Sequence, residues 1–362
     1  MKAVVLAGGY ATRLRPISYV LPKLLFPVAG KPMIYWTLDL LKRFRVDEVV
    51  LGVNYLADAL LKRIGQEYHG IRIKYSLEKT PLGTAGPIKL ASLKTKLTET
   101  FIALNGDIIA NINLDEMISR HLTSHFTVTD ALHEVEDPSQ FGVVEVDKMS
   151  RIIRFVEKPA KGEAPSKLIN AGIYLLNRNV LSMIASDRKV SLERDIFPGL
   201  ASRRKLGGFI HSDYWFDIGS FADYKNANFA LMKTHGSIRP TRVNISKSSK
   251  LIPSVVVGEH VRISGNVRVG PNVAIGNETC VDRSCRVSNS IIFDGVDIGP
   301  GTKISGAIVA SDTRIGKGVI VEPETIISPN VTVRDGVRIR KGAIIHPYKE
   351  ITEDVRSRAQ VM

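Results

Sequence analysis

The first residues of the chain combine glycines and cations at a spacing that suits phosphate binding. Residues Ala3 to Ala7 are apolar and uncharged, which is typical of a strand buried on both faces of a parallel sheet. Gly8 and Gly9 follow at once, and glycine allows a sharp turn and a close approach to a ligand. Arg13 and Lys23 lie in the same loop, where cations can neutralise a polyphosphate held by backbone N–H groups. A mobile glycine loop with solvated charges would give the same pattern.

Two acidic residues follow short apolar runs further along the chain. Asp107 ends the run Phe101–Asp107, and Asp217 lies within Trp215–Gly219. A carboxylate at the carboxyl end of a strand can hold a metal ion that also binds phosphate. Taken singly, either residue could instead cap the next element.

The N-terminal stretch resembles the signature of the sugar-1-phosphate nucleotidyltransferases. The resemblance is carried by Leu6–Pro16 together with Pro22–Lys23. The family usually has Gly where this chain has Ala11, and Pro where it has Leu24. A Cβ atom at position 11 is tolerable only if that residue does not need a positive φ.

Later motifs resemble the same family and follow in its order, so the resemblance covers roughly residues 1–230. They are Gln140–Glu145, Ile152–Pro159, Ile169–Leu176 and Trp215–Gly219. Such enzymes transfer a nucleotidyl group from a nucleoside triphosphate to a sugar 1-phosphate and release pyrophosphate. The nucleophile is already an anionic phosphate oxygen, so the enzyme must supply alignment and charge neutralisation rather than a general base.

The resemblance implies a role for each matching residue. Arg13 and Lys23 would be the catalytic cations, and Asp107 and Asp217 would hold one Mg²⁺ between the two phosphate substrates. The remaining residues bind substrates: Leu6, Ala7, Gly8, Gly9, Glu78 and Gly83 the nucleotide, and Gly142, Glu157, Lys158 and Asn170 the sugar phosphate.

Within the family, the mannose-1-phosphate guanylyltransferases are the most similar group. The segments that carry this resemblance are Leu82–Pro87, Val135–Val144, Arg154–Pro159 and Ser191–Pro198. Uridylyl- and thymidylyltransferases typically have Gln where this chain has Glu78. A carboxylate can accept two hydrogen bonds, which suits the N1–H and N2–H₂ edge of guanine. GTP and mannose 1-phosphate are therefore the expected substrates. A glucose-1-phosphate uridylyl- or thymidylyltransferase, or a catalytically silent regulatory subunit of the same architecture, is the alternative.

The elements that must position these residues divide the chain into two parts. Strand-like runs alternate with helical patterns up to residue 233, which predicts a Rossmann-like, mostly parallel α/β sheet as the nucleotidyltransferase domain. Residues 234–250 are predicted to be a linker. From Leu251 aliphatic residues recur every six positions, which predicts a parallel β-helix over residues 251–362. The motif resembles the left-handed hexapeptide type with three repeats per coil. Its expected role is homo-oligomer formation, and an acyltransferase activity stays open because His260 and His346 lie near its ends.

Composition limits the function classes. The chain has 362 residues, a formal net charge of +14 and two cysteines, so neither a disulfide framework nor a Cys-ligated zinc site is expected. No apolar run approaches a membrane span. The chain shows no basic block with interleaved aromatic residues, so the charge favours small anionic substrates over nucleic acid. A soluble cytoplasmic enzyme without nucleic-acid or membrane partners is predicted.

His121 and His125 are four residues apart, but no third metal ligand is evident.

Overall fold

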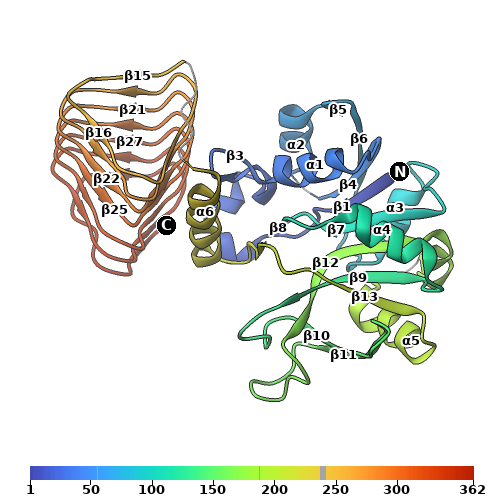
Figure 1. Ribbon diagram of the computed structural model, residues 1–362. Coiled ribbons are helices and arrows are strands. Elements are labelled where there is room, and N and C mark those ends of the chain that lie inside the picture. The colour runs from blue at the N-terminus through green and yellow to red at the C-terminus, as the bar shows by residue number, and fades with distance from the viewer. Residues whose placement is uncertain (55, 187, 237–241) are drawn as a thin grey trace. The chain divides into compact units, whose positions relative to one another are not determined.

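The computed structural model describes residues 1–54, 56–186, 188–236 and 242–362. Its contacts divide the chain into two compact units. The first consists of Met1–Tyr10 and Ile34–Asp217, and the second consists of Ala11–Met33 and Ile218–Met362. The middle of the predicted linker, residues 237–241, lies outside the described residues. Each unit contains a hydrophobic core of its own, and Figure 1 shows the helices and strands that enclose these cores.

The first unit is built on a twisted sheet whose centre is parallel, as the sequence predicted. β1 (Lys2–Leu6) lies between β4 (Glu48–Val53) and β7 (Thr100–Asn105), and both pairings are parallel. β6 (Ile71–Leu77) continues the parallel part beyond β4. The core residues of β1 and β4 are fully buried, which explains their unbroken apolar sequences.

The far side of this sheet is mainly antiparallel. β12 (Leu168–Asn177) pairs antiparallel with β7, and the order of the sheet is β11-β10-β12-β7-β1-β4-β6-β5. The remaining strands of the first unit are β5 (Glu67–Tyr68), β8 (Ile108–Ala110), β9 (Val128–Glu134), β10 (Gly142–Val146), β11 (Ile152–Glu157), β13 (Leu206–Ile210) and β14 (Trp215–Asp217).

Helices follow most of the parallel strands, as alternation in the sequence predicted (Figure 1). The α-helices are α1 (Met33–Arg43), α2 (Ala57–Ile64), α3 (Gly86–Ser92), α4 (Leu114–Thr123), α5 (Phe197–Ser202) and, in the second unit, α6 (Phe221–His235). His121 lies near the end of α4, is buried, and bonds Thr129 (2.8 Å) and Asn177 (3.0 Å). His125 lies beyond the end of the helix, so the two histidines are not on one helical face.

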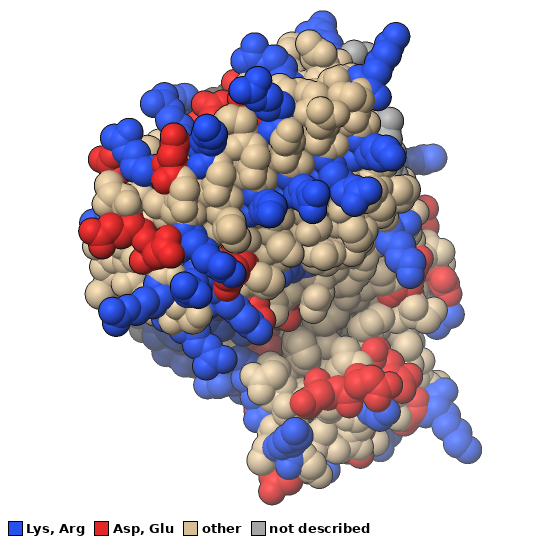
Figure 2. Space-filling model, turned by 90° about the vertical axis from the view of Figure 1, so that its left-hand side faces the viewer, with Lys and Arg blue, Asp and Glu red and all other residues tan. Residues whose placement is uncertain are grey.

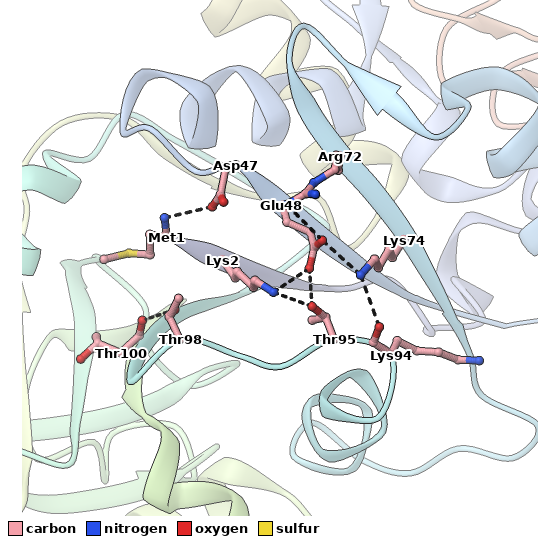
Figure 3. A network of polar contacts seen from close by, with 10 residues as sticks. All are labelled: Met1, Lys2, Asp47, Glu48, Arg72, Lys74, Lys94, Thr95, Thr98 and Thr100. Carbon is pink, nitrogen blue, oxygen red and sulfur yellow. Dashed lines mark hydrogen bonds and ion pairs between the residues drawn. The ribbon is translucent and has the colours of Figure 1, made fainter.

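The amino ends of the parallel strands are tied together by one buried carboxylate. Glu48 begins β4 and its side chain is 3% exposed. Lys2 of β1 and Lys74 of β6 each place Nζ 3.1 Å from it, and Thr95 donates a hydrogen bond to it. Figure 3 shows these side chains converging on Glu48 from the two strands that flank β4 and from the loop that contains Thr95. Burial by itself raises the pKa of Glu48, but the hydrogen bonds from Thr95, Lys2 and Lys74 outweigh burial and hold the pKa at about 2.

Glu48→Gln is therefore expected to reduce the free energy of unfolding at pH 7 by about 1–2 kcal/mol. The folded-state pKa lies below the usual value of 4.5, so the ionised carboxylate stabilises the fold above about pH 4.5. This contribution is lost as the pH falls from there toward 2. Urea unfolding at pH 7 and pH 3 should show a smaller pH dependence for the variant. Glu99→Gln is the control, because Glu99 forms an exposed pair with Arg178 and such pairs contribute little; equal effects of the two changes would contradict the assignment.

The second unit contains a β-helix, as the six-residue period predicted. In the described part of the chain its short strands form three parallel sheets. One holds β15 (Asn244–Ile245), β18 (Arg262–Ile263), β21 (Cys280–Val281), β24 (Asp297–Ile298), β27 (Arg314–Ile315), β30 (Thr332–Val333) and β33 (Glu350–Ile351). The next holds β16 (Lys250–Leu251), β19 (Arg268–Val269), β22 (Arg286–Ser288), β25 (Lys303–Ser305), β28 (Ile320–Val321) and β31 (Arg338–Ile339). The third holds β17 (Val255–Val257), β20 (Val273–Ile275), β23 (Ser290–Ile292), β26 (Ile308–Val309), β29 (Ile326–Ile327), β32 (Ile344–Ile345) and β34 (Gln360–Val361).

The register shows three strands per coil and explains the slips in the period. Ile263 pairs with Val281, eighteen residues on, whereas Val281 pairs with Ile298, seventeen residues on. In the shortened coils, the inward aliphatic residues are Ile292 and Val309. Each lies five residues after the preceding inward residue, so a strict period of six does not include it. The first strands begin at Asn244, inside the stretch predicted as linker. Cys285 is fully buried in the core of the β-helix, and burial raises its pKa.

One sheet of the β-helix carries an in-register column of cations, here called the basic column. Lys250, Arg268, Arg286 and Lys303 occupy equivalent positions on four successive coils. All four are exposed, and within the described residues none of them forms an ion pair. Neighbouring strands lie about 4.8 Å apart, where like charges repel. Figure 2 shows Lys and Arg side chains gathered in a row over the β-helix.

The segment Ala11–Met33 packs on the β-helix and α6, within the second unit. Phe26, Tyr224 and Phe293 form an aromatic cluster with edge-to-face contacts, with ring centroids 5.7 to 6.3 Å apart. All three side chains are at most 1% exposed. A Cβ atom on Gly30 would lie 2.5 Å from a methyl group of Val256 in β17. The segment Ala11–Met33 is thus packed tightly against residues of the β-helix and α6 that lie outside the interior core of the β-helix.

Candidate active site

The glycines of the signature lie at the carboxyl ends of the parallel strands. The backbone N–H groups of Ala7 and Gly106 donate to Gly52 and Leu6, respectively, and so extend the sheet by one residue on either side. Beyond this point Gly8 and Gly9 leave the sheet, and the side chain of Asn54 donates to the Gly8 carbonyl (2.7 Å). This is where nucleotides bind in parallel α/β sheets.

The carboxylate of Glu78 lies directly against Gly8. Glu78 follows β6, is 9% exposed, and its Oε1 atom would be 2.2 Å from a Cβ atom on Gly8. Any residue other than glycine at position 8 would require the Glu78 carboxylate to move. Oε1 is buried and has no hydrogen-bond partner among the described residues. Burial raises the pKa of Glu78, and a hydrogen bond from the Leu82 backbone opposes part of the rise.

The loop that contains Gly83 is held by the segment before η5 (Leu192–Ile196). The backbone of Val190 donates to Leu82 and accepts from Ala85, both at 3.0 Å. Gly83 has a φ of +82°, and a Cβ atom there would lie 2.2 Å from the Val190 carbonyl oxygen. The loop thus needs glycine both for its conformation and for its close approach to Val190.

Ala11 has the conformation for which the family uses glycine. Its φ is 47° and its ψ is 43°, in the left-handed region. Its carbonyl oxygen accepts hydrogen bonds from the Leu14 backbone and from the Ser18 hydroxyl, and these bonds hold the turn. A non-glycine residue in this region costs roughly 1 kcal/mol.

Ala11→Gly is expected to stabilise the protein slightly, by up to about 1 kcal/mol, because the strain removed exceeds the added flexibility of the unfolded chain. Thermal unfolding measures the effect. Ala222→Gly is the matched control: Ala222 lies exposed in α6, so glycine there should destabilise by about 1 kcal/mol. If both changes destabilise equally, position 11 carries no strain.

The two predicted catalytic cations lie in the signature segment of the second unit. Arg13 belongs to the 3₁₀ turn Thr12–Leu14 and Lys23 to the turn Lys23–Leu25. Arg13 is exposed, and its guanidinium lies over Gly219, where a Cβ atom would be 2.7 Å from a terminal nitrogen. Gly219 follows Asp217 by two residues, so the motif Trp215–Gly219 contains both an acid and the glycine that makes room for Arg13.

The two predicted metal ligands are brought together by a short antiparallel ribbon in the first unit. Asp217 of β14 pairs with Ile108 of β8, the residue that follows Asp107. Among the described residues no group of three or more metal-binding side chains occurs. The backbone pairing brings the two residues near each other, and Mg²⁺ is commonly held by one or two carboxylates together with phosphate and water.

The predicted sugar-phosphate residues lie on the antiparallel side of the sheet. Gly142 of β10 pairs with Glu157 of β11, and a Cβ atom on Gly142 would be 3.0 Å from a carboxylate oxygen of Glu157. Burial raises the pKa of Glu157, and the charge of Glu193 raises it further. Lys158 is exposed, has a φ of 48°, and donates its N–H to the Phe141 carbonyl (3.0 Å).

Asn170 lies where the pairing of β12 with β9 is interrupted. Its Nδ2 donates to the Tyr174 hydroxyl (3.0 Å), and its Oδ1 accepts from the Gly172 N–H (2.8 Å). Trp215 donates Nε1–H to the Ala171 carbonyl (2.9 Å), next to Asn170. At the interruption, this part of β12 leaves its regular pairing with β9. It lies close to the Asn105–Asp107 turn, since a Cβ atom on Gly172 would be 2.6 Å from the Asn105 side chain.

Sequence reasoning missed two acidic residues beside this region. Glu193 accepts hydrogen bonds from Thr84, Ser191 and Tyr174. Asp130 is fully buried, and burial together with the charge of Glu193 raises its pKa well above the usual value. Glu193 lies within Ser191–Pro198, a segment that resembles the guanylyltransferases, so the sequence held a signal for it; Asp130 gave none.

Comparison with known proteins identifies the family of the chain. The model of the "Nucleotidyl transferase" family matches residues 2–234, and that of the "GMPPB C-terminal domain" matches residues 251–361. The chain belongs to the nucleotidyl transferase family. The family assignment made from the motifs is thereby confirmed, as is the prediction of an enzyme that transfers nucleotidyl groups. Nucleotidyl transferases of this family use a divalent metal.

Relatives match over the whole length. The chain is 35% identical to the mannose-1-phosphate guanylyltransferase 1 of Arabidopsis thaliana and 35% identical to the mannose-1-phosphate guanyltransferase of Debaryomyces hansenii, covering 100% of both chains in each case. HddC from Yersinia pseudotuberculosis, in a crystal structure complexed with GMP-PN, is similar to 64% of this chain with a TM-score of 0.53 and 29% identity, and 99% of that chain is covered.

Proposed function

We propose that the protein transfers the guanylyl group of GTP to mannose 1-phosphate, forming GDP-mannose and pyrophosphate. The observation that carries the base assignment is the Glu78 carboxylate, which is buried against Gly8 with one oxygen lacking a hydrogen-bond partner among the described residues. An unmet buried acceptor is costly, and the N–H groups of guanine would satisfy it. The named function of the full-length relatives supports the same substrates.

The residues act by orientation and charge. Leu6, Ala7, Gly8 and Gly9 supply backbone next to the nucleotide, and Gly83 places its loop beside Glu78. Arg13 and Lys23 neutralise the triphosphate charge that builds up at the α-phosphorus; their assignment rests on the signature.

The acceptor sugar phosphate has its own set of residues. Lys158 binds its phosphate, and Gly142, Glu157 and Asn170 bind its hydroxyl groups. Asp107 and Asp217 would hold Mg²⁺, which when bound draws the two phosphate groups together and withdraws charge from them. The attacking phosphate oxygen is already ionised, so these residues need only align it with the α-phosphorus.

Two further proposals come from the sequence. The first is that the enzyme forms homo-oligomers through the β-helix, whose exposed ends and edges need to be covered. The second is a cytoplasmic location. Among the described residues, no helix has the length and apolarity required to span a membrane.

Glu78→Gln tests the base assignment. The amide replaces one acceptor with a donor, which suits uracil or thymine and leaves guanine with a mismatched contact. We expect GTP to lose roughly 5- to 150-fold in kcat/KM relative to UTP or dTTP, corresponding to about 1–3 kcal/mol. Pyrophosphate release with the three nucleotides, at a fixed concentration of mannose 1-phosphate, measures this ratio.

The matched control for this change is Glu145→Gln. Glu145 lies on β10, where its carboxylate faces Arg154 at 3.8 Å, so its removal should leave the nucleotide ratio unchanged. A wild-type enzyme that prefers UTP or dTTP would overturn the guanine assignment and the role of Glu78 together.

A further inference from the structure

Glu193 lies between the two groups of residues that are assigned to the two substrates. Its carboxylate uses a different oxygen for each side. Oε2 accepts hydrogen bonds from the hydroxyl groups of Thr84 and Ser191, both at 2.6 Å, whereas Oε1 accepts from the Tyr174 hydroxyl at 3.3 Å. Glu193 itself is half-buried in η5.

On the nucleotide side, Glu193 holds the glycine loop through Thr84. The Thr84 hydroxyl donates to Glu193 and also accepts the N–H of Leu192 at 2.8 Å. The two backbone hydrogen bonds of Val190 to Leu82 and Ala85 fix the rest of the loop. The loop and the Val190–Glu193 segment therefore form one rigid piece.

On the sugar side, Tyr174 carries the connection to the interrupted part of β12. The Tyr174 hydroxyl donates to Glu193 and accepts from Nδ2 of Asn170 at 3.0 Å. The chain of hydrogen bonds thus runs from Thr84 through Glu193 and Tyr174 to Asn170. Tyr174 is fully buried, so its ring cannot move without disturbing the core.

The charge of Glu193 also acts on the neighbouring acids. Burial is the largest cause of the raised pKa of both Glu157 and Asp130, and the charge of Glu193 is the second largest. A displacement of Glu193 would therefore change the pKa of Glu157 as well as the position of Asn170. Both residues belong to the proposed sugar-phosphate site.

We propose that Glu193 is a positioning residue that couples the nucleotide loop to the sugar-phosphate strand, so that each substrate helps to order the binding residues of the other. This inference rests on the proposed function, because that proposal assigns the two sides of the site. Glu193 acts only through Thr84 and Tyr174. Thr84→Val and Tyr174→Phe each remove one hydroxyl group, and hence one arm of the connection, at nearly unchanged volume.

Steady-state kinetics test the coupling. Thr84→Val should raise KM for the nucleotide and, at least about twofold, also KM for the sugar phosphate. Tyr174→Phe should raise KM for the sugar phosphate and, at least about twofold, also KM for the nucleotide. Glu193→Gln turns one carboxylate oxygen into a donor. In that background, the effect of each change on KM for the other substrate should fall below about twofold, which is the deviation from additivity usual for independent sites. Cross-effects that are absent from the wild-type background, or that persist with Glu193→Gln, would overturn the proposal.

A binding measurement separates this inference from the proposed function. Trp36 and Trp215 are the two tryptophans of the chain, so Trp36→Phe leaves Trp215, bonded to Ala171 beside Asn170, as the fluorescent reporter. Titration with whichever nucleotide the wild type binds best should change Trp215 fluorescence, and Glu193→Gln should abolish the change while equilibrium dialysis still detects binding. If that nucleotide is UTP, the guanine assignment fails but this test stands. An unaltered signal with Glu193→Gln would show that Glu193 does not couple the sites.

Discussion

Asp107→Asn and Asp217→Asn are each expected to lower kcat by at least about 100-fold. The β8–β14 ribbon places both acids at adjacent strand ends, and an amide keeps the shape of the side chain but removes the charge that a divalent cation needs. Pyrophosphate release as a function of Mg²⁺ concentration measures the loss. Folding should be unaffected, which circular dichroism and thermal unfolding can establish.

Asp115→Asn is the control for these two changes, because Asp115 is an exposed acid in the first turn of α4. It should leave turnover unchanged. Near-normal magnesium-dependent turnover in either ribbon variant would contradict the two-acid metal site.

Phe293→Ala, a change within the β-helix, is expected to destabilise the protein by about 3–5 kcal/mol and to lower kcat at least about tenfold at a temperature where the fold persists. Phe293 packs edge-to-face on Phe26, and Phe26 lies three residues after Lys23. A cavity beneath this segment would let the proposed catalytic cations Arg13 and Lys23 shift, and small misplacements at an active site are costly. Kinetics combined with thermal unfolding separate the two effects.

The matched control is Ile339→Ala, because Ile339 is also buried but belongs to the interior core of the β-helix, which does not include Phe293. It should also destabilise the protein, by about 2–5 kcal/mol, but leave kcat unchanged below the unfolding transition. Equal kinetic effects of the two variants would mean that Phe293 contributes only to general stability.

The sequence predicted those features that depend on local pattern. Three patterns in the sequence depend on neighbouring residues alone: the apolar run Ala3–Ala7, the glycines after it and the six-residue aliphatic period. The structure confirms the sheet and the β-helix that they predicted. Glu78 was singled out because it stands where the similar uridylyl- and thymidylyltransferases typically have Gln, and the structure places it against Gly8. Its role toward guanine stays a prediction, as do the roles of the other site residues and the domain boundaries.

Other features depend on contacts that no local pattern reports. The packing of Phe26 on Phe293 joins residues that are far apart in the chain, and no pattern in the sequence connects the β-helix with the segment that contains Arg13 and Lys23. The left-handed conformation of Ala11 is fixed by hydrogen bonds from Leu14 and Ser18 rather than by Ala11 itself. Glu193 lies within a motif that carries the family resemblance, but sequence reasoning did not single it out, because its contacts with Thr84 and Tyr174 come from separate elements.

The basic column restricts the symmetry that a homo-oligomer of this protein can have. A two-fold axis through that sheet would place Lys250, Arg268, Arg286 and Lys303 of one subunit opposite the same four residues of another. Eight cations would then face each other without acidic partners, and such a self-complementary contact would require anions between the subunits. An assembly with two-fold symmetry through the β-helix is therefore expected to use one of the other two sheets or an end of the coil. A head-to-tail contact could still use the basic column, provided that it meets an acidic surface of the next subunit.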